Sequence, residues 1–70
     1  MKIGTKVKCL CGSIDRGRGR GEIGVVTSLT RFSQYHPQEA SVTLDRGEEI
    51  GFSGGWFWVS DLEELEGVKS

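Results

Sequence analysis

The chain of 70 residues is predicted to fold as a single all-β domain, a small barrel of five short strands. Several short segments alternate apolar and polar residues with a period of two, the pattern of half-buried strands. No segment keeps a helical apolar period beyond one turn, which argues against helices. A flat sheet of this size would expose two long edges, and curling it into a barrel covers them.

The first half of the chain contains two predicted strands separated by a glycine-rich loop. Residues 5–11 alternate, and residues 22–29 are rich in β-branched side chains. The residues expected on one face of the first strand are Val7, Cys9 and Cys11. Those expected on one side of the second are Ile23, Val25, Thr27 and Leu29. Residues 12–21 hold four glycines and predict a long exposed loop.

The centre of the chain predicts a tight hairpin. Residues 39–45 alternate, and a turn at 45–48 with Gly47 leads to a returning strand at 49–52. The side chains expected to point inward are Ala40, Val42, Leu44, Ile50 and Phe52. Residues 30–38 form a second loop, and residues 53–55 are expected to end the hairpin.

Four of the six aromatic residues fall within positions 52–58. Since alternate residues of a strand point to opposite sides, Trp56 and Trp58 should share one face and Phe57 the other. Residues 60–62 predict a single 3-10 turn and residues 62–66 a closing strand. Residues 67–70 are expected to fray at the chain end.

Three segments carry a family resemblance. They are TKVK at 5–8, preceded by Gly4; EIGVV at 22–26, in which Gly24 stands at a central position; and WVSDLEEL at 58–65. Together they resemble SH3-like small barrels, including ribosomal-type KOW modules and photosystem I reaction-centre subunit IV. The resemblance spans most of the chain and implies the barrel fold more than a function.

The loop between the first two strands differs from that of signalling SH3 domains. In those domains an acidic loop and an aromatic-rich opening motif receive proline-rich peptides, whereas this loop carries Arg16, Arg18 and Arg20 and the first strand has no tyrosine. Recognition of proline-rich peptides is therefore not expected.

The charge is unevenly distributed along the chain. Residues 1–35 hold seven basic and two acidic side chains, and residues 36–70 hold two basic and eight acidic ones, although the net charge is only −1. The two halves either form opposite poles or interleave, depending on the strand order.

The composition predicts an ordered domain in the cytoplasm. The chain is 36% hydrophobic and 27% charged, and it has no apolar run long enough to span a membrane and no signal-peptide pattern. Two cysteines are fewer than small secreted domains usually carry. The shortness of the chain also suggests a phage or mobile-element origin.

Catalytic, metal and cofactor sites are not predicted. The string at 19–26 matches G-x-G-x-x-G-x-V, but phosphate-binding glycines should open a helix and these lead into a strand. Cys9, Cys11 and His36 supply too few ligands for tetrahedral zinc, and the two thiols are expected in the core. His36 has no nucleophile or orienting carboxylate at a recognisable spacing.

The sequence therefore predicts a non-catalytic docking module with a protein partner. Trp and Tyr are enriched at binding hot spots, and arginines steer acidic partners. The expected binding residues are Arg16, Arg18, Arg20, Arg31, Phe32, Tyr35, Trp56 and Trp58. Two plainer interpretations stay open: the tryptophans cap the barrel, and the arginines lie in a solvated loop.

The alternative partner is RNA or single-stranded DNA. Arginine-glycine segments such as 16–21 clamp phosphates while aromatic rings stack on bases. The sequence pI of about 5.7 is low for a dedicated nucleic-acid binder. The oligomeric state is left open.

Overall fold

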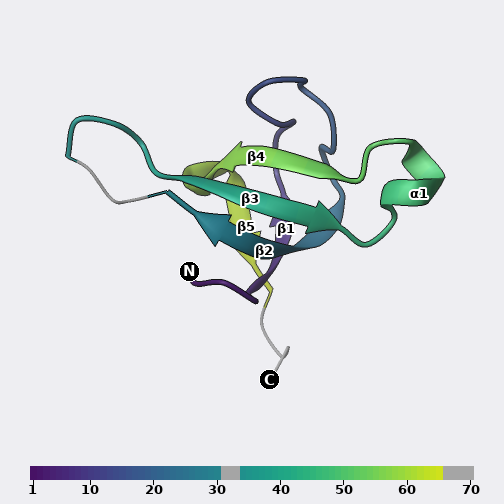
Figure 1. Ribbon diagram of the computed structural model, residues 1–70, viewed down its shortest axis with the longest axis horizontal. Coiled ribbons are helices and arrows are strands. Elements are labelled where there is room, and N and C mark those ends of the chain that lie inside the picture. The colour runs from purple at the N-terminus through teal and green to yellow at the C-terminus, as the bar shows by residue number, and fades with distance from the viewer. Residues whose placement is uncertain (31–33, 66–70) are drawn as a thin grey trace.

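The computed structural model describes residues 1–30 and 34–65 and consists mainly of β-strands (Figure 1). The elements in chain order are β1 (Lys6–Cys9), β2 (Ile23–Leu29), β3 (Glu39–Leu44), α1 (Gly47–Ile50), β4 (Gly54–Trp58), the 3-10 turn η1 (Val59–Asp61) and β5 (Leu62–Glu64). The all-β prediction with five strands and one 3-10 turn before the last strand is confirmed. The residues expected to fray, 67–70, lie outside the described part.

All five strands belong to one antiparallel sheet in the order β4-β3-β2-β1-β5. The sheet is open, with β4 and β5 as its edges. β1 is an interior strand of the sheet, because it pairs with β2 on one side and with β5 on the other. Within the described residues, no helix is long and apolar enough to cross a bilayer.

The core lies on one face of the sheet and is centred on Phe57, whose side chain is 0% exposed. Its members are Val7, Cys9, Val26, Ala40, Val42, Leu44, Phe52, Phe57 and Leu62. The alternation predicted for β3 is confirmed, since Ala40, Val42 and Leu44 are all buried there. Cys11 was expected in the core but is exposed, because β1 ends at Cys9.

The two faces of β2 differ from the predicted alternation. Gly24 and Val26 are buried, whereas Ile23 is 39% exposed. A β-bulge between Val26 and Ser28 shifts the register against β3, so that Leu29 returns to the core side. The four residues expected on one side therefore divide between both.

The predicted tight hairpin is wrong. Residues 47–50, which span the predicted turn and the start of the predicted returning strand, form the single helical turn α1. Gly51 closes it in the left-handed region with φ of 72°. β3 pairs with β4, which includes the glycines that were expected to end the hairpin. Phe52 is nevertheless buried, because it packs into the core from the loop between α1 and β4.

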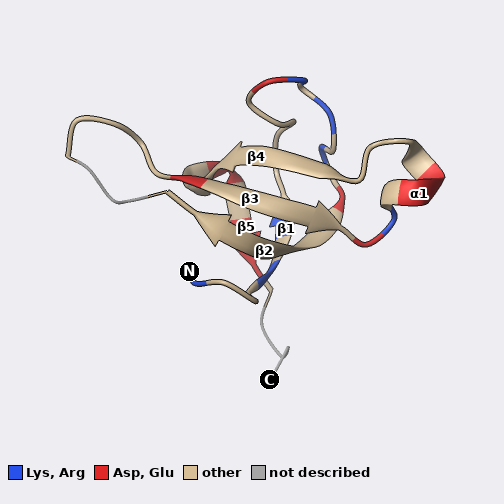
Figure 2. Ribbon diagram, in the orientation of Figure 1, with Lys and Arg blue, Asp and Glu red and all other residues tan. Residues whose placement is uncertain are grey.

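The basic and acidic halves interleave rather than form two poles. Lys6 of β1 pairs with Asp45 at 2.7 Å, and Arg46 lies 3.9 Å from Glu22. Figure 2 shows basic and acidic residues alternating in the connection from β3 to α1. No large single-sign field follows from the uneven sequence.

Candidate functional site

The solvent-facing side of β4 carries both tryptophans. Phe57 points into the core, while Trp56 is 38% exposed and Trp58 is half-buried on the opposite face, as the alternation predicts. We call the surface formed by Trp56 and Trp58 the tryptophan face. Because Trp56 is exposed there, this face is accessible to a partner.

The neighbours of the tryptophan face are small or polar. Trp56 lies opposite Ser41 and Trp58 opposite Glu39 on β3. The Thr27 hydroxyl donates to the Ser41 backbone oxygen at 3.2 Å, so the adjacent surface is fixed by a cross-strand bond. Small neighbours leave the indole rings as the dominant apolar feature of this face.

The loop at residues 12–21, which we call the arginine loop, is folded around Ser13. This side chain is 4% exposed, and its hydroxyl oxygen accepts the backbone N–H of Arg16 at 3.2 Å and of Arg18 at 3.4 Å. The Ser13 N–H donates to Arg18 O and the Gly17 N–H to Ser13 O, both at 2.8 Å. The loop is therefore an ordered turn, although its outer side chains are exposed.

The arginine loop is attached to β4 and to the core. The Ile14 N–H donates to Trp56 O at 2.8 Å, which places the loop along the outer edge of β4, where it arches above the strand in Figure 1. Gly19 packs so closely that an added Cβ would lie 3.1 Å from the Phe57 ring and 3.3 Å from the Phe52 ring. The loop thus covers one end of the core.

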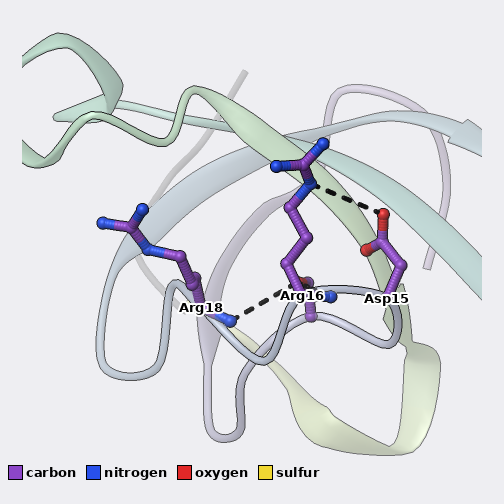
Figure 3. Close-up of polar contacts among 4 residues, drawn as sticks. Asp15, Arg16 and Arg18 are labelled. Atoms are coloured by element: carbon purple, nitrogen blue, oxygen red, sulfur yellow. Dashed lines mark hydrogen bonds and ion pairs between the residues drawn. The ribbon is translucent and has the colours of Figure 1, made fainter.

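The three loop arginines have different environments. The Arg18 guanidinium donates to Ile50 O at 2.9 Å and lies 5.8 Å from the centre of the Phe52 ring. Arg16, 71% exposed, approaches Asp15 at 4.0 Å, and its side chain leaves the loop in a different direction from Arg18 (Figure 3). Arg20 is exposed and makes no ion pair within the described residues. Within the described residues, the Arg16 and Arg18 side chains contact different partners.

The loop between β2 and β3 is the third element of the predicted site. Arg31 and Phe32 lie outside the described residues. Tyr35 is 80% exposed, on a loop that projects beyond the ends of β2 and β3 (Figure 1). The structure thus brings the two tryptophans together and ties the arginine loop to them, whereas Tyr35 belongs to a separate projection.

Two residues that organise the site were missed in the sequence, Ser13 and Ile14. A serine that accepts N–H groups from following residues is a known turn former, so Ser13 had a local signal. The bond from Ile14 to β4 is made by its backbone N–H while its side chain is 38% exposed, so no residue type in the sequence indicated it.

The two cysteines are chemically distinct. Burial, together with the nearby Glu22 carboxylate, raises the pKa of the Cys9 thiol from 9.0 to about 11. Among the described residues, no group of three His, Cys, Asp or Glu side chains is placed to hold a metal ion.

We expect a thiol reagent at about pH 8 to modify Cys11 quickly and Cys9 only after unfolding, because the thiolate is the reactive form. Counting modified thiols with time measures this. Cys11→Ser should remove the fast phase and Cys9→Ser should retain it. A fast phase that survives in Cys11→Ser would contradict the burial of Cys9.

No protein-family model, curated protein or solved structure matches this chain. Its function is therefore inferred from the geometry of its own residues.

Proposed function

We propose that this domain is a non-catalytic docking module that binds a protein partner through the tryptophan face. The observation that carries the proposal is the position of Trp56, exposed on the outer face of an edge strand whose next residue, Phe57, anchors the core. A large aromatic side chain on a rigid scaffold loses little conformational entropy on binding and supplies a large apolar area.

The charge distribution favours a protein over a nucleic acid. A phosphate backbone is bound by several cations directed at one strand. Here Arg18 is engaged by Ile50 O, Lys6 pairs with Asp45, and the net charge of the chain is −1. Arg16 and Arg20 are left exposed, which suits steering of an acidic protein surface towards Trp56.

We also propose that the open sheet is a variant of the SH3-like small barrel. The strand order β4-β3-β2-β1-β5 supports this, as does the 3-10 turn η1 that joins the two edge strands. In such a barrel, loops at the rim meet the ligand. The arginine loop beside Trp56 is in keeping with that arrangement.

The test compares Trp56→Ala with Leu10→Ala, which removes another exposed apolar side chain, on the segment that follows β1. A partner is captured from the host with the wild-type domain, purified, and titrated against both variants. We expect Trp56→Ala to weaken binding by at least about tenfold, as hot-spot residues do, and Leu10→Ala to have little effect. Equal affinities for the wild type and Trp56→Ala would contradict the proposal.

The nucleic-acid alternative gives a different result. The domain is titrated with generic single-stranded RNA and DNA at two salt concentrations. Affinity that falls steeply with salt, and that is lost when Arg16, Arg18 and Arg20 are all replaced by alanine, would replace the proposed function with nucleic-acid binding.

A further inference from the structure

The two edges of the sheet are protected in different ways. β5 has only three residues, and two of them are Glu63 and Glu64. Short, charged edge strands resist pairing with a second chain. β4 has the sequence GGWFW, with no charge and no proline, which is the composition of an edge prone to pairing.

The backbone groups on the outer edge of β4 follow from its bonds to β3. Ser53 O accepts from Leu44 N–H at 2.8 Å. The Val59 N–H donates to Gln38 O at 3.0 Å. The backbone N–H and C=O groups of odd-numbered residues therefore point towards β3, and those of even-numbered residues point towards the outer edge of the sheet. The residues whose N–H and C=O groups lie on the outer edge are Gly54, Trp56 and Trp58.

The arginine loop occupies this outer edge. A backbone bond made there runs from Ile14 N–H to Trp56 O. Ser13 lies beside Gly55, because a Cβ added at Gly55 would be 3.6 Å from the Ser13 Cβ. A second strand cannot pair with the middle of β4 while the loop is in this position.

Arg18 holds the loop from its other end. Its guanidinium donates to Ile50 O, a carbonyl in the last turn of α1, and covers the Phe52 ring. A cation at the C-terminal carbonyls of a helical turn is favourable, and a hydrogen bond from a charged donor is stronger than a neutral one. Arg16, by contrast, makes only a 4.0 Å contact with its neighbour Asp15.

We propose that the arginine loop shields the β4 edge and that the Arg18 side chain holds the loop there. When the contact between the Arg18 guanidinium and Ile50 O is lost, β4 becomes free to pair antiparallel with β4 of a second copy of this chain. A second copy is the occupant that fits because identical, uncharged strands pair about a two-fold axis without like-charge repulsion. This inference does not depend on the proposed partner binding.

The test compares the self-association of Arg18→Ala and Arg16→Ala by sedimentation from micromolar to millimolar concentration. The two variants remove the same charge from the same loop, but only Arg18→Ala removes the contact with α1. We expect Arg18→Ala to dimerise at least about tenfold more tightly than the wild type, and Arg16→Ala to match the wild type. Hydrogen exchange at high concentration should then show protection of the Trp56 and Trp58 amides in Arg18→Ala.

Three results would overturn the inference: a folded Arg18→Ala that associates no more than the wild type, equal association of Arg16→Ala, or association without protection of the β4 amides. If Arg18→Ala melts below the assay temperature, Arg18→Met decides in its place. Methionine keeps an unbranched apolar side chain at this position and removes the guanidinium, which contacts the Phe52 ring and donates to Ile50 O.

Discussion

Phe57→Ala is expected to abolish most of the stability of the domain. Phe57 is the largest fully buried side chain, and it is enclosed by the arginine loop at Gly19 as well as by the sheet. Truncating a buried phenylalanine costs about 3–5 kcal/mol through lost transfer energy and the cavity left behind. A domain of this length has a total free energy of unfolding of about 4–10 kcal/mol. Urea denaturation followed by tryptophan fluorescence should show a transition at much lower urea, or none.

The adjacent Trp56→Ala is the matched control. Tryptophan is larger than phenylalanine, but Trp56 lies on the opposite face and is partly exposed, so its removal opens no cavity in the core. We expect it to lose less than half as much stability as Phe57→Ala. An equal loss would show that Trp56 is a structural residue, and the proposed binding role of the tryptophan face would fail with it.

Local alternation was sufficient to predict most strands. β3 and the triplet Trp56-Phe57-Trp58 follow the period of two directly, because each buries one face only. In β2 one buried position is Gly24, and because glycine has no side chain the apolar alternation does not mark this position as inward. The bulge after Val26 then reverses which side of the sheet the later β2 side chains point to, and no local sequence pattern indicates this bulge.

The error at residues 45–55 has a definite physical cause. Ile50 and Phe52 are two positions apart, which is the spacing of inward residues in a strand. A single helical turn is too short for the strand period of two and the helical period of 3.6 residues to be distinguished. In the sequence Gly54 and Gly55 suggest a break, although a Cβ added at Gly54 would overlap the Val42 carbonyl oxygen. Glycine there permits close approach of β4 to β3 instead of ending a strand.

The candidate site was only partly predictable. The shared face of Trp56 and Trp58 is a local property of a strand and was predicted. The role of Arg18 is not local, since its acceptor Ile50 O lies 32 residues further along the chain. A glycine-rich segment with three arginines looks solvated in the sequence, and only the tertiary structure shows that one of the three is held against α1 and Phe52.

Gly24→Ala is expected to destabilise the domain, although strand propensity alone predicts the opposite sign. Alanine is favoured over glycine inside a strand by about 0.5–1 kcal/mol. At this position, however, a Cβ would lie 2.5 Å from Thr43 O and 2.7 Å from Val42 Cγ1. Gly24 is flanked by β1 and β3, so β2 cannot move away from one neighbour without disturbing the other. Overpacking of this kind costs about 1–3 kcal/mol, and a clash with backbone favours the upper end.

Gly55→Ala separates this steric effect from propensity. Gly55 also lies in a strand, but the nearest atom to its added Cβ is the Phe52 Cζ at 3.1 Å, the tip of a side chain rather than backbone. We expect thermal melting to show a clear loss in Gly24→Ala and little change in Gly55→Ala. A Gly24→Ala variant as stable as the wild type would mean that β2 and β3 are not in the observed register. The assignment of the buried and exposed faces of β3 and β4, and with it the tryptophan face, would then have to be revised, because a shift of one residue exchanges the two faces of a strand.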